Sequence, residues 1–195
     1  MGDLVLLRAV SAGDAKTFEV MVARGRNVPI GAYYLAGLYA TEEILSFMRW
    51  EAIFGATFIS VGAAVAGNGR LFATALPDAD IDQVHWLAGA AGGNIEILRT
   101  LLRTGVRIQD LDMLLMTMAY HGHGNTLRQF IRLAGITTAP YIELMAADWN
   151  AFLGESRYQG LPVRYAVFSR TPEDVLRMGI MRIVDVNTFT GWHTT

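Results

Sequence analysis

Apolar residues recur with helical spacing along most of the chain, in units that begin at a capping residue and close at a glycine. Residues 91–105, AGGNIEILRTLLRTG, show this pattern most clearly. Their apolar side chains fall on one face of a predicted helix: Ile97, Leu98, Leu101 and Leu102. Residues 11–25, SAGDAKTFEVMVARG, show the same spacing 80 positions earlier. The two segments are therefore predicted to be copies of one helical unit.

The start of each unit is marked by a residue whose side chain suits a helix N-cap. Asp, Asn and Thr accept a hydrogen bond from an N–H that the first helical turn leaves unpaired. Such residues recur 26 or 27 positions apart, at Asp14, Thr41, Asn68 and Asn94. Two further caps are predicted at Asn125 and at Thr171, which is followed by a proline and two acids. Four glycines are predicted to end helices in the left-handed conformation: Gly25, Gly105, Gly135 and Gly179.

A second helix, made of small and apolar residues, is predicted before each cap. These helices are expected at residues 4–10, 32–39, 58–66, 84–91 and 114–120. Two helices in every 27 residues or so predict an all-α fold, an α-solenoid of stacked helical hairpins in which each hairpin buries its face against its neighbours. The small residues would let neighbouring helices approach closely.

We expect one domain over residues 1–195. The repeats are clearer over residues 1–136 and weaker over 137–180, where 147–160 and 169–179 are fainter copies. Residues 163–170 look less helical, and residues 183–190, IVDVNTFT, have the β-branched and aromatic content of a strand. This irregular C-terminal segment, with a tail or cap at 181–195, is expected to cap the last repeat or to lie across the stack.

The best-preserved unit resembles the ankyrin repeat. Residues 93–98, GNIEIL, are similar to the family's G-H-L-E-I-V, and residues 101–106, LLRTGV, to its L-L-L/E-x-G-A. The family's T-P-L-H opening would fall on residues 84–87 and is absent, and the spacing of 26–27 is shorter than the family's 33 or so. The resemblance implies a divergent ankyrin-like stack with shortened loops over about residues 3–136. Another helical-hairpin solenoid is the alternative.

This resemblance implies a non-enzymatic protein–protein interaction module that binds a folded protein partner through its concave face and loops. Contacts are expected from Asp80 and Gln83, which precede an inner helix. Further contacts are expected where inner helices end, at Ser11, Ala12, Ala91, Gly92, His121 and His123. No cofactor, metal or catalytic residue is expected.

Charge and hydrophobicity narrow the classes of partner. The net charge of the chain is −2, which does not favour binding to nucleic acid. Lys16 is the single lysine, and the other basic residues are fifteen arginines. Charged residues make up 17% of the chain, against about 25% in an average domain, and hydrophobic residues make up 52%. A chain with so few charges has apolar surface to cover, so a homo-oligomeric structural or assembly protein is the alternative function.

Some histidines and acids have the residue types of metal ligands or catalytic groups. His121-Gly122-His123 could bind a metal, but no neighbour in sequence supplies a third ligand, so a metal-dependent enzyme is the weakest alternative. Asp78, Asp80 and Asp82 lack the glycine and distant glutamate of a calcium loop and are expected in a solvated loop. There is no cysteine, nucleophile elbow or phosphate-binding lysine motif. Three tryptophans, Trp50, Trp86 and Trp149, are expected in the core, and Trp192 is expected to be exposed.

The uncharged stretch at residues 52–69 has only the minimum length of a membrane span and contains four glycines. It is predicted to be a buried helix and loop. The first ten residues lack the basic start of a secretory signal. These features predict a cytoplasmic protein with no membrane partner, and a host cell or a virion is the alternative location.

Overall fold

The computed structural model describes residues 2–39, 42–48, 53–137 and 140–186, and this part of the chain is mostly helical. The α-helices are α1 (Gly2–Ala12), α2 (Ala15–Ala23), α3 (Ile30–Tyr39), α4 (Glu42–Phe47), α5 (Ile53–Val65), α6 (Gly69–Ala75), α7 (Gln83–Gly92), α8 (Ile95–Thr104), α9 (Leu111–Tyr120), α10 (Gly124–Ala134), α11 (Pro140–Ala147), α12 (Trp149–Gln159) and α13 (Pro172–Met178). A short 3-10 helix, η1 (Leu76–Asp78), follows α6. Two antiparallel strands, β1 (Arg164–Phe168) and β2 (Met181–Asp185), form the sheet. The predicted predominance of helix is confirmed.

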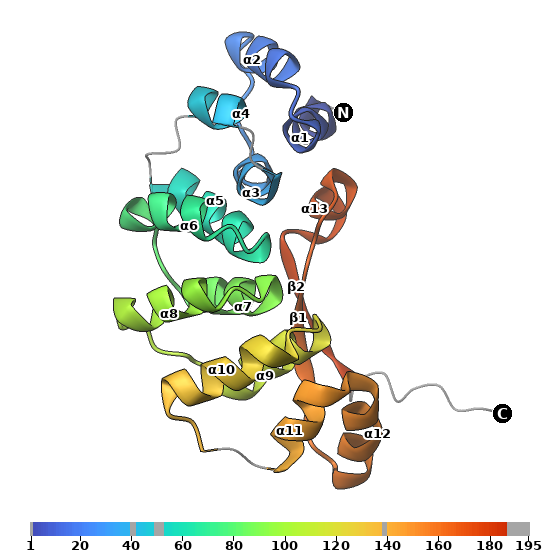
Figure 1. Ribbon diagram of the computed structural model, residues 1–195. Coiled ribbons are helices and arrows are strands. Elements are labelled where there is room, and N and C mark those ends of the chain that lie inside the picture. Colours follow the sequence, from blue (N-terminus) through green and yellow to red (C-terminus); the bar gives the residue numbers. More distant parts are fainter. Residues whose placement is uncertain (1, 40–41, 49–52, 138–139, 187–195) are drawn as a thin grey trace, which may run out of the picture.

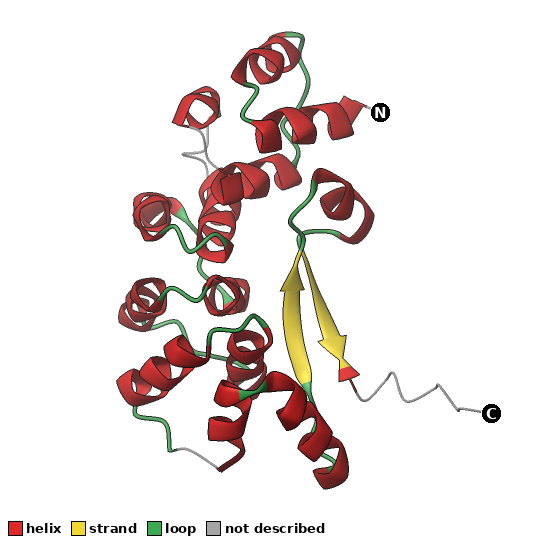
Figure 2. Ribbon diagram, turned by 45° about the vertical axis from the view of Figure 1, so that its right-hand side comes forward, coloured by secondary structure: helices red, strands yellow, loops and turns green. Residues whose placement is uncertain are grey.

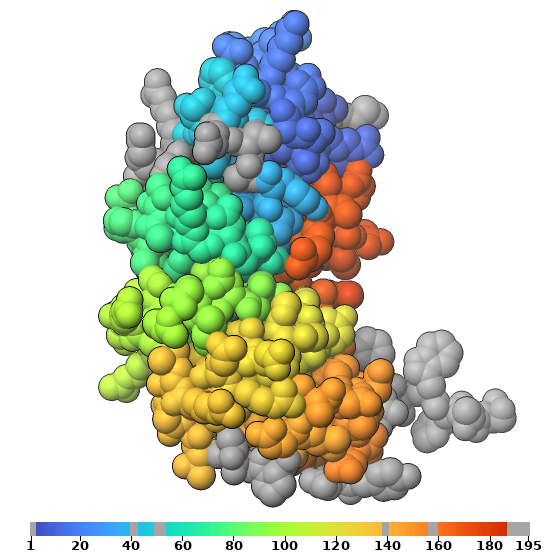
Figure 3. All heavy atoms as spheres, viewed as in Figure 1, coloured from blue at the N-terminus to red at the C-terminus, as the bar shows by residue number. Residues whose placement is uncertain are grey.

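The helices form two neighbouring rows in a column (Figure 1). Helices α1, α3, α5, α7 and α9 pack one on the next, and we call them the inner row. Helices α2, α4, α6, α8 and α10 form the outer row on one side of it. The space-filling view shows the chain advancing along the column from the N-terminal end towards α11 and α12 (Figure 3). The five inner helices include all five segments predicted from small and apolar residues, apart from the end of the third, where α5 stops at Val65.

Local signals at the helix ends agree with the prediction in most places. The side chains of Asp14, Asn68, Asn94 and Thr171 accept hydrogen bonds from main-chain N–H groups in the first turn of their helices. All four closing glycines have positive φ, between 65° and 80°. The prediction for Asn125 is wrong, because α10 begins at Gly124 with His123 as its N-cap residue, and Asn125 lies inside the first turn. Thr41 lies outside the described residues.

Aromatic and aliphatic side chains fill the space between the rows. Phe18, Phe72 and Leu98 occupy the same place in their units and are each at most 1% exposed. Trp86 is fully buried and Trp149 is partly buried against the core, which fits the prediction for both. Trp50 and Trp192 lie outside the described residues. The buried helix predicted at 52–69 is α5, whose residues from Ile59 to Val65 are all buried.

Glycines bring inner helices into main-chain contact. A β-carbon on Gly37 of α3 would lie 2.1 Å from the main-chain oxygen of Ile59 in α5. A β-carbon on Gly62 of α5 would lie 2.1 Å from the main-chain oxygen of Tyr34 in α3. Each helix therefore presents a glycine to the backbone of the other, and no larger residue fits at either position.

The chain after α12 turns back along the column (Figure 2). Strand β1 packs on α9 and α7, and α13 packs on α1 and α3. We call residues 163–186 the C-terminal segment. The sequence predicts that this segment either caps the last repeat or lies across the stack, and in the structure it lies across the inner row. Residues 169–179, predicted to be a faint further copy, instead contain α13 at the opposite end of the column from α12, and the strand predicted at 183–190 begins earlier, at Met181.

Replacing Gly37 with Ala is expected to lower the free energy of unfolding by about 1–3 kcal/mol, since the added methyl group forces α3 and α5 apart. The matched control is Gly154→Ala on α12, where a β-carbon meets nothing within 4 Å. That change should raise stability by about 0.5–1 kcal/mol through helix propensity. Urea denaturation of both variants checks this, and equal stability of the two variants would contradict the close contact.

Candidate functional site

The residues expected to contact a partner lie on two separate edges of the column. Asp80 and Gln83 stand at the start of α7, on what we call the loop edge. The other expected residues stand where α1, α7 and α9 end, on what we call the turn edge. Helix α7 has ten residues and is about 15 Å long, so the two groups do not form one patch.

On the loop edge, two carboxylates remain free. Asp78 and Asp80 are exposed, and neither forms an ion pair within the described residues. The main-chain N–H of Asp80 donates to Thr57 Oγ1 at 2.9 Å, which ties the loop to α5. Gln83 is used internally, because its Oε1 accepts from the N–H of Gln109 at 2.9 Å. Its Nε2 is buried, and no described residue forms a hydrogen bond with it.

Asp82 connects the loop edge to a buried polar network. Its carboxylate caps α7 and lies 2.9 Å from Nδ1 of His85, whose hydrogen bond holds the pKa of Asp82 below its usual value. His85 Nε2 lies 2.9 Å from Oγ of Ser60. Ser, His and Asp in this order can form a catalytic triad. Here Ser60 and His85 are both 0% exposed, so no substrate reaches the hydroxyl, and the network joins α5 to α7 instead.

On the turn edge, several expected contact residues are engaged in packing. Ala91 is buried, and its carbonyl oxygen lies 3.0 Å from Nε2 of His123. Gly92 is held against α5, since a β-carbon there would lie 1.9 Å from the oxygen of Ala64. Ser11 donates to the carbonyl of Arg8, and Ala12 is exposed. Ala12 is thus the most accessible of these positions.

His121 holds the C-terminal segment rather than facing solvent. Its Nε2 lies 3.1 Å from the carbonyl oxygen of Ala166 in β1. Burial lowers the pKa of His121, so the neutral ring is favoured, and its N–H can donate to that carbonyl. The His123 ring stacks beside it with a centroid distance of 6.5 Å. Within the described part of the chain, no three His, Asp or Glu side chains gather as a metal site requires.

The inner row binds the C-terminal segment chiefly through main-chain atoms. Thr117 Oγ1 accepts from the N–H of Ala166 at 3.0 Å. Tyr34 donates its buried hydroxyl to the carbonyl of Ser169 at 2.7 Å, and burial raises the pKa of this hydroxyl. Tyr39 donates to the carbonyl of Arg170.

One ion pair joins β1 to the helical column, and another joins α13 to it. They are Arg164–Asp110 at 2.7 Å and Arg8–Glu173 at 2.6 Å. The residues that hold the segment come from α1, α3, α9 and the loop before α9. The sequence indicates this contact with the C-terminal segment only through the hydroxyl and imidazole groups that occur within otherwise apolar helices. The segment therefore covers part of the inner face that the sequence assigned to a partner.

Comparison with protein-family models, curated proteins and solved structures finds no match for this chain. The helices of the described residues were also compared with the length and apolarity that a membrane span requires, and none reaches them.

Replacing Tyr34 with Phe should lower the free energy of unfolding by about 1–3 kcal/mol, since the carbonyl of Ser169 would lose its buried donor. Tyr33→Phe on the same helix is the matched control, because the hydroxyl of Tyr33 forms no hydrogen bond with the residues that the structure describes. Urea denaturation and proteolysis within residues 163–186 measure the effect. Equal stability and equal cleavage of the two variants would show that the Tyr34 bond does not hold the segment.

Acidification should destabilise the folded chain through His121. Because its folded pKa lies below the unfolded value, the unfolded chain takes up the proton first as pH falls below about 6.5. Stability is then lost down to the folded pKa. His121→Gln keeps a donor for Ala166 and removes the titration, so its urea midpoint should fall less than that of the wild type between pH 7.5 and 5.5. Parallel pH profiles of the two proteins would contradict this.

Proposed function

We propose that this chain is a divergent, ankyrin-like α-solenoid that acts as a non-enzymatic protein–protein interaction module. The succession of paired helices in the column supports the solenoid, since each inner helix packs on the next. The caps at Asp14, Asn68 and Asn94 support a common unit. Asn94 also donates from Nδ2 to the carbonyl of Gly67 at 2.8 Å and so joins its unit to the preceding one.

The opening of α7 adds support for the ankyrin resemblance. In the family's T-P-L-H motif, a capping residue stands three positions before a histidine. Asp82 and His85 have the same spacing, and Nδ1 of His85 lies 2.9 Å from the carboxylate of Asp82 across the first turn of α7. This opening lies two residues before the place where the family's motif would fall, and Gln83 and Val84 stand where the motif has Pro and Leu.

The observation that carries the proposed binding mode is the free acidic loop edge beside an inner face that is partly covered. The C-terminal segment occupies part of the inner row, whereas Asp78 and Asp80 extend into solvent from a loop that Thr57 holds in place. A folded protein with basic residues would find fixed carboxylates there, at little cost in loop ordering. We therefore propose that the loop edge makes the main contact with the partner and that Ala12 on the turn edge makes a secondary one.

The proposal predicts that Asp78→Asn with Asp80→Asn weakens capture of the partner by about tenfold or more, as loss of central charged contacts does at interfaces. Immobilised protein is incubated with lysate of the cells that express it, and captured proteins are quantified by mass spectrometry. Glu155→Gln on α12, an exposed acid far from this edge, is the control and should capture the partner like the wild type. Ala12→Arg tests the turn edge separately.

Two results would contradict the proposal. Unchanged capture by the double variant would remove the loop edge from the interface. If the wild type captures only copies of itself and scatters light as an oligomer, the homo-oligomeric alternative replaces binding to a different protein.

A further inference from the structure

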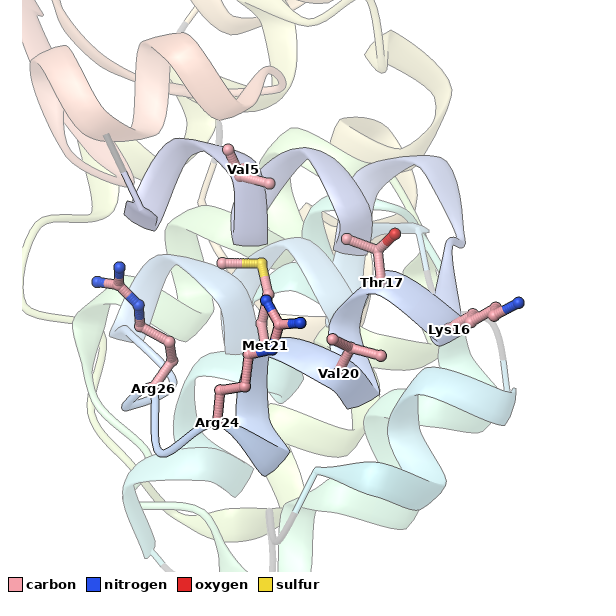
Figure 4. A pocket seen from close by; sticks show the side chains of 7 residues that line it. All are labelled: Val5, Lys16, Thr17, Val20, Met21, Arg24 and Arg26. Carbon is pink, nitrogen blue, oxygen red and sulfur yellow. The ribbon is translucent and has the colours of Figure 1, made fainter.

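The first helical pair carries an open groove at the N-terminal end of the column. A cavity of about 510 Å³ lies against α1 and α2 (Figure 4). Three apolar side chains, Val5, Val20 and Met21, and three cations, Lys16, Arg24 and Arg26, line it. We call these six residues the N-terminal groove. Val5 is 49% exposed and Val20 is 42% exposed, which is high for apolar residues that lie side by side.

Two of these positions are buried in a unit that has a preceding neighbour. Counted 80 residues further on, Val5 corresponds to His85 and Met21 to Leu101. His85 and Leu101 are both 0% exposed, and His85 bonds Ser60 of the preceding inner helix. The floor of the N-terminal groove at Val5 and Met21 therefore corresponds to positions that are filled inside the column, whereas Val20 corresponds to Thr100, which is half-buried.

The exposed side chains at the opposite end of the column are of a different kind. Where the structure describes the side chains of α12, at residues 149–155, the exposed ones are small or polar: Asn150, Ala151, Gly154 and Glu155. Terminal units of repeat proteins carry such a polar outer face because it keeps the end of the stack soluble. The N-terminal groove has no such polar face, so its apolar floor is suited to contact with an apolar surface of another molecule.

Charge identifies the kind of contact. Arg24 and Arg26 form no ion pair within the described part of the chain, and no acidic residue lines the groove. Two copies of the groove facing each other would bring six cations together, which opposes a symmetric dimer through this face. An apolar floor between two helices, bordered by cations, matches a helix that carries an apolar stripe flanked by acids.

We propose that the N-terminal groove binds an acidic amphipathic helix of another protein. The apolar stripe of that helix would cover Val5, Val20 and Met21, and its carboxylates would pair with Lys16, Arg24 and Arg26. This site is separate from the loop edge and rests on the packing of the column alone. The substitutions at Asp78 and Asp80 should accordingly leave it unchanged, and its own variants should leave loop-edge binding unchanged.

The test uses the full chain and two fluorescein-labelled, 15-residue helical peptides. One carries Leu at positions i, i+3, i+4 and i+7 of its apolar face and Glu on the flanks, and the other has Lys in place of every Glu. Fluorescence anisotropy should show the Glu peptide binding about tenfold or more tightly than the Lys peptide, with the difference shrinking at high salt. Val20→Asp should weaken the Glu peptide about tenfold or more, because it places a charge in the apolar floor. The triple change K16E/R24E/R26E should reverse the preference.

Ile183→Asp on β2 is the matched control, since Ile183 is an equally exposed apolar residue outside the groove. It should bind the Glu peptide like the wild type, and circular dichroism verifies that each variant is folded. Lys16 is the single lysine, so a carbodiimide cross-link to the Glu peptide should map to Lys16 and disappear in Lys16→Arg.

The proposal is overturned if the two peptides bind equally, if Val20→Asp has no effect, or if the cross-link persists in Lys16→Arg. It is also overturned if vesicles containing phosphatidylserine bind the groove while the Glu peptide does not, since the occupant would then be a lipid surface. Groove-dependent dimerisation in light scattering would instead identify a second copy as the occupant.

Discussion

Main-chain contact between neighbouring inner helices is the constraint from which the other features of this protein follow. Gly37 and Gly62 bring α3 and α5 together, and Gly92 holds the end of α7 against α5. Helices this close must keep one register, because a shift along the axis would place a side chain where a carbonyl oxygen now lies. That register brings the turns of successive units near enough for Asn94 to bond Gly67 and for His123 to bond Ala91. The two edges of the column are thus held as rigid surfaces by packing in its interior.

The C-terminal segment changes what such a column can offer to a partner. Its strand β1 is held by side chains of the inner row that bond main-chain atoms, as Thr117 and Tyr34 do. Such contacts recognise an extended backbone and depend little on the side chains of the bound segment. On the side of the inner row that β1 and α13 cover, the C-terminal segment lies between the inner helices and any approaching molecule. The proposed contact therefore moves to the loop edge, where the carboxylates of Asp78 and Asp80 are free.

The two ends of the column differ in chemistry as well as in position. The exposed side chains described on α12 are small or polar, whereas the N-terminal groove combines an apolar floor with arginines that form no ion pair within the described residues. The same repeat positions hold a buried His85 and Leu101 inside the column, and an exposed Val5 and a half-buried Met21 at its end. These positions carry residues suited to packing against a neighbouring helix. Whether a neighbouring helix covers them depends on where the unit lies in the column. An acidic loop edge and a basic groove would let one chain contact two different partners.

The sequence by itself determined the elements whose causes are local. Asp14, Asn94 and Thr171 cap helices because each bonds an N–H two or three residues ahead, and the closing glycines adopt a backbone conformation that few other residues reach. Asn125 is not the cap that its residue type predicts, because α10 already begins at Gly124, whose main chain lies close to the oxygen of Ala146. Only the tertiary structure decided where the C-terminal segment lies, because the bond from His121 to Ala166 joins residues 45 positions apart. Contacts of this kind depend on which face each helix presents once the column has formed, and no short stretch of sequence contains that information.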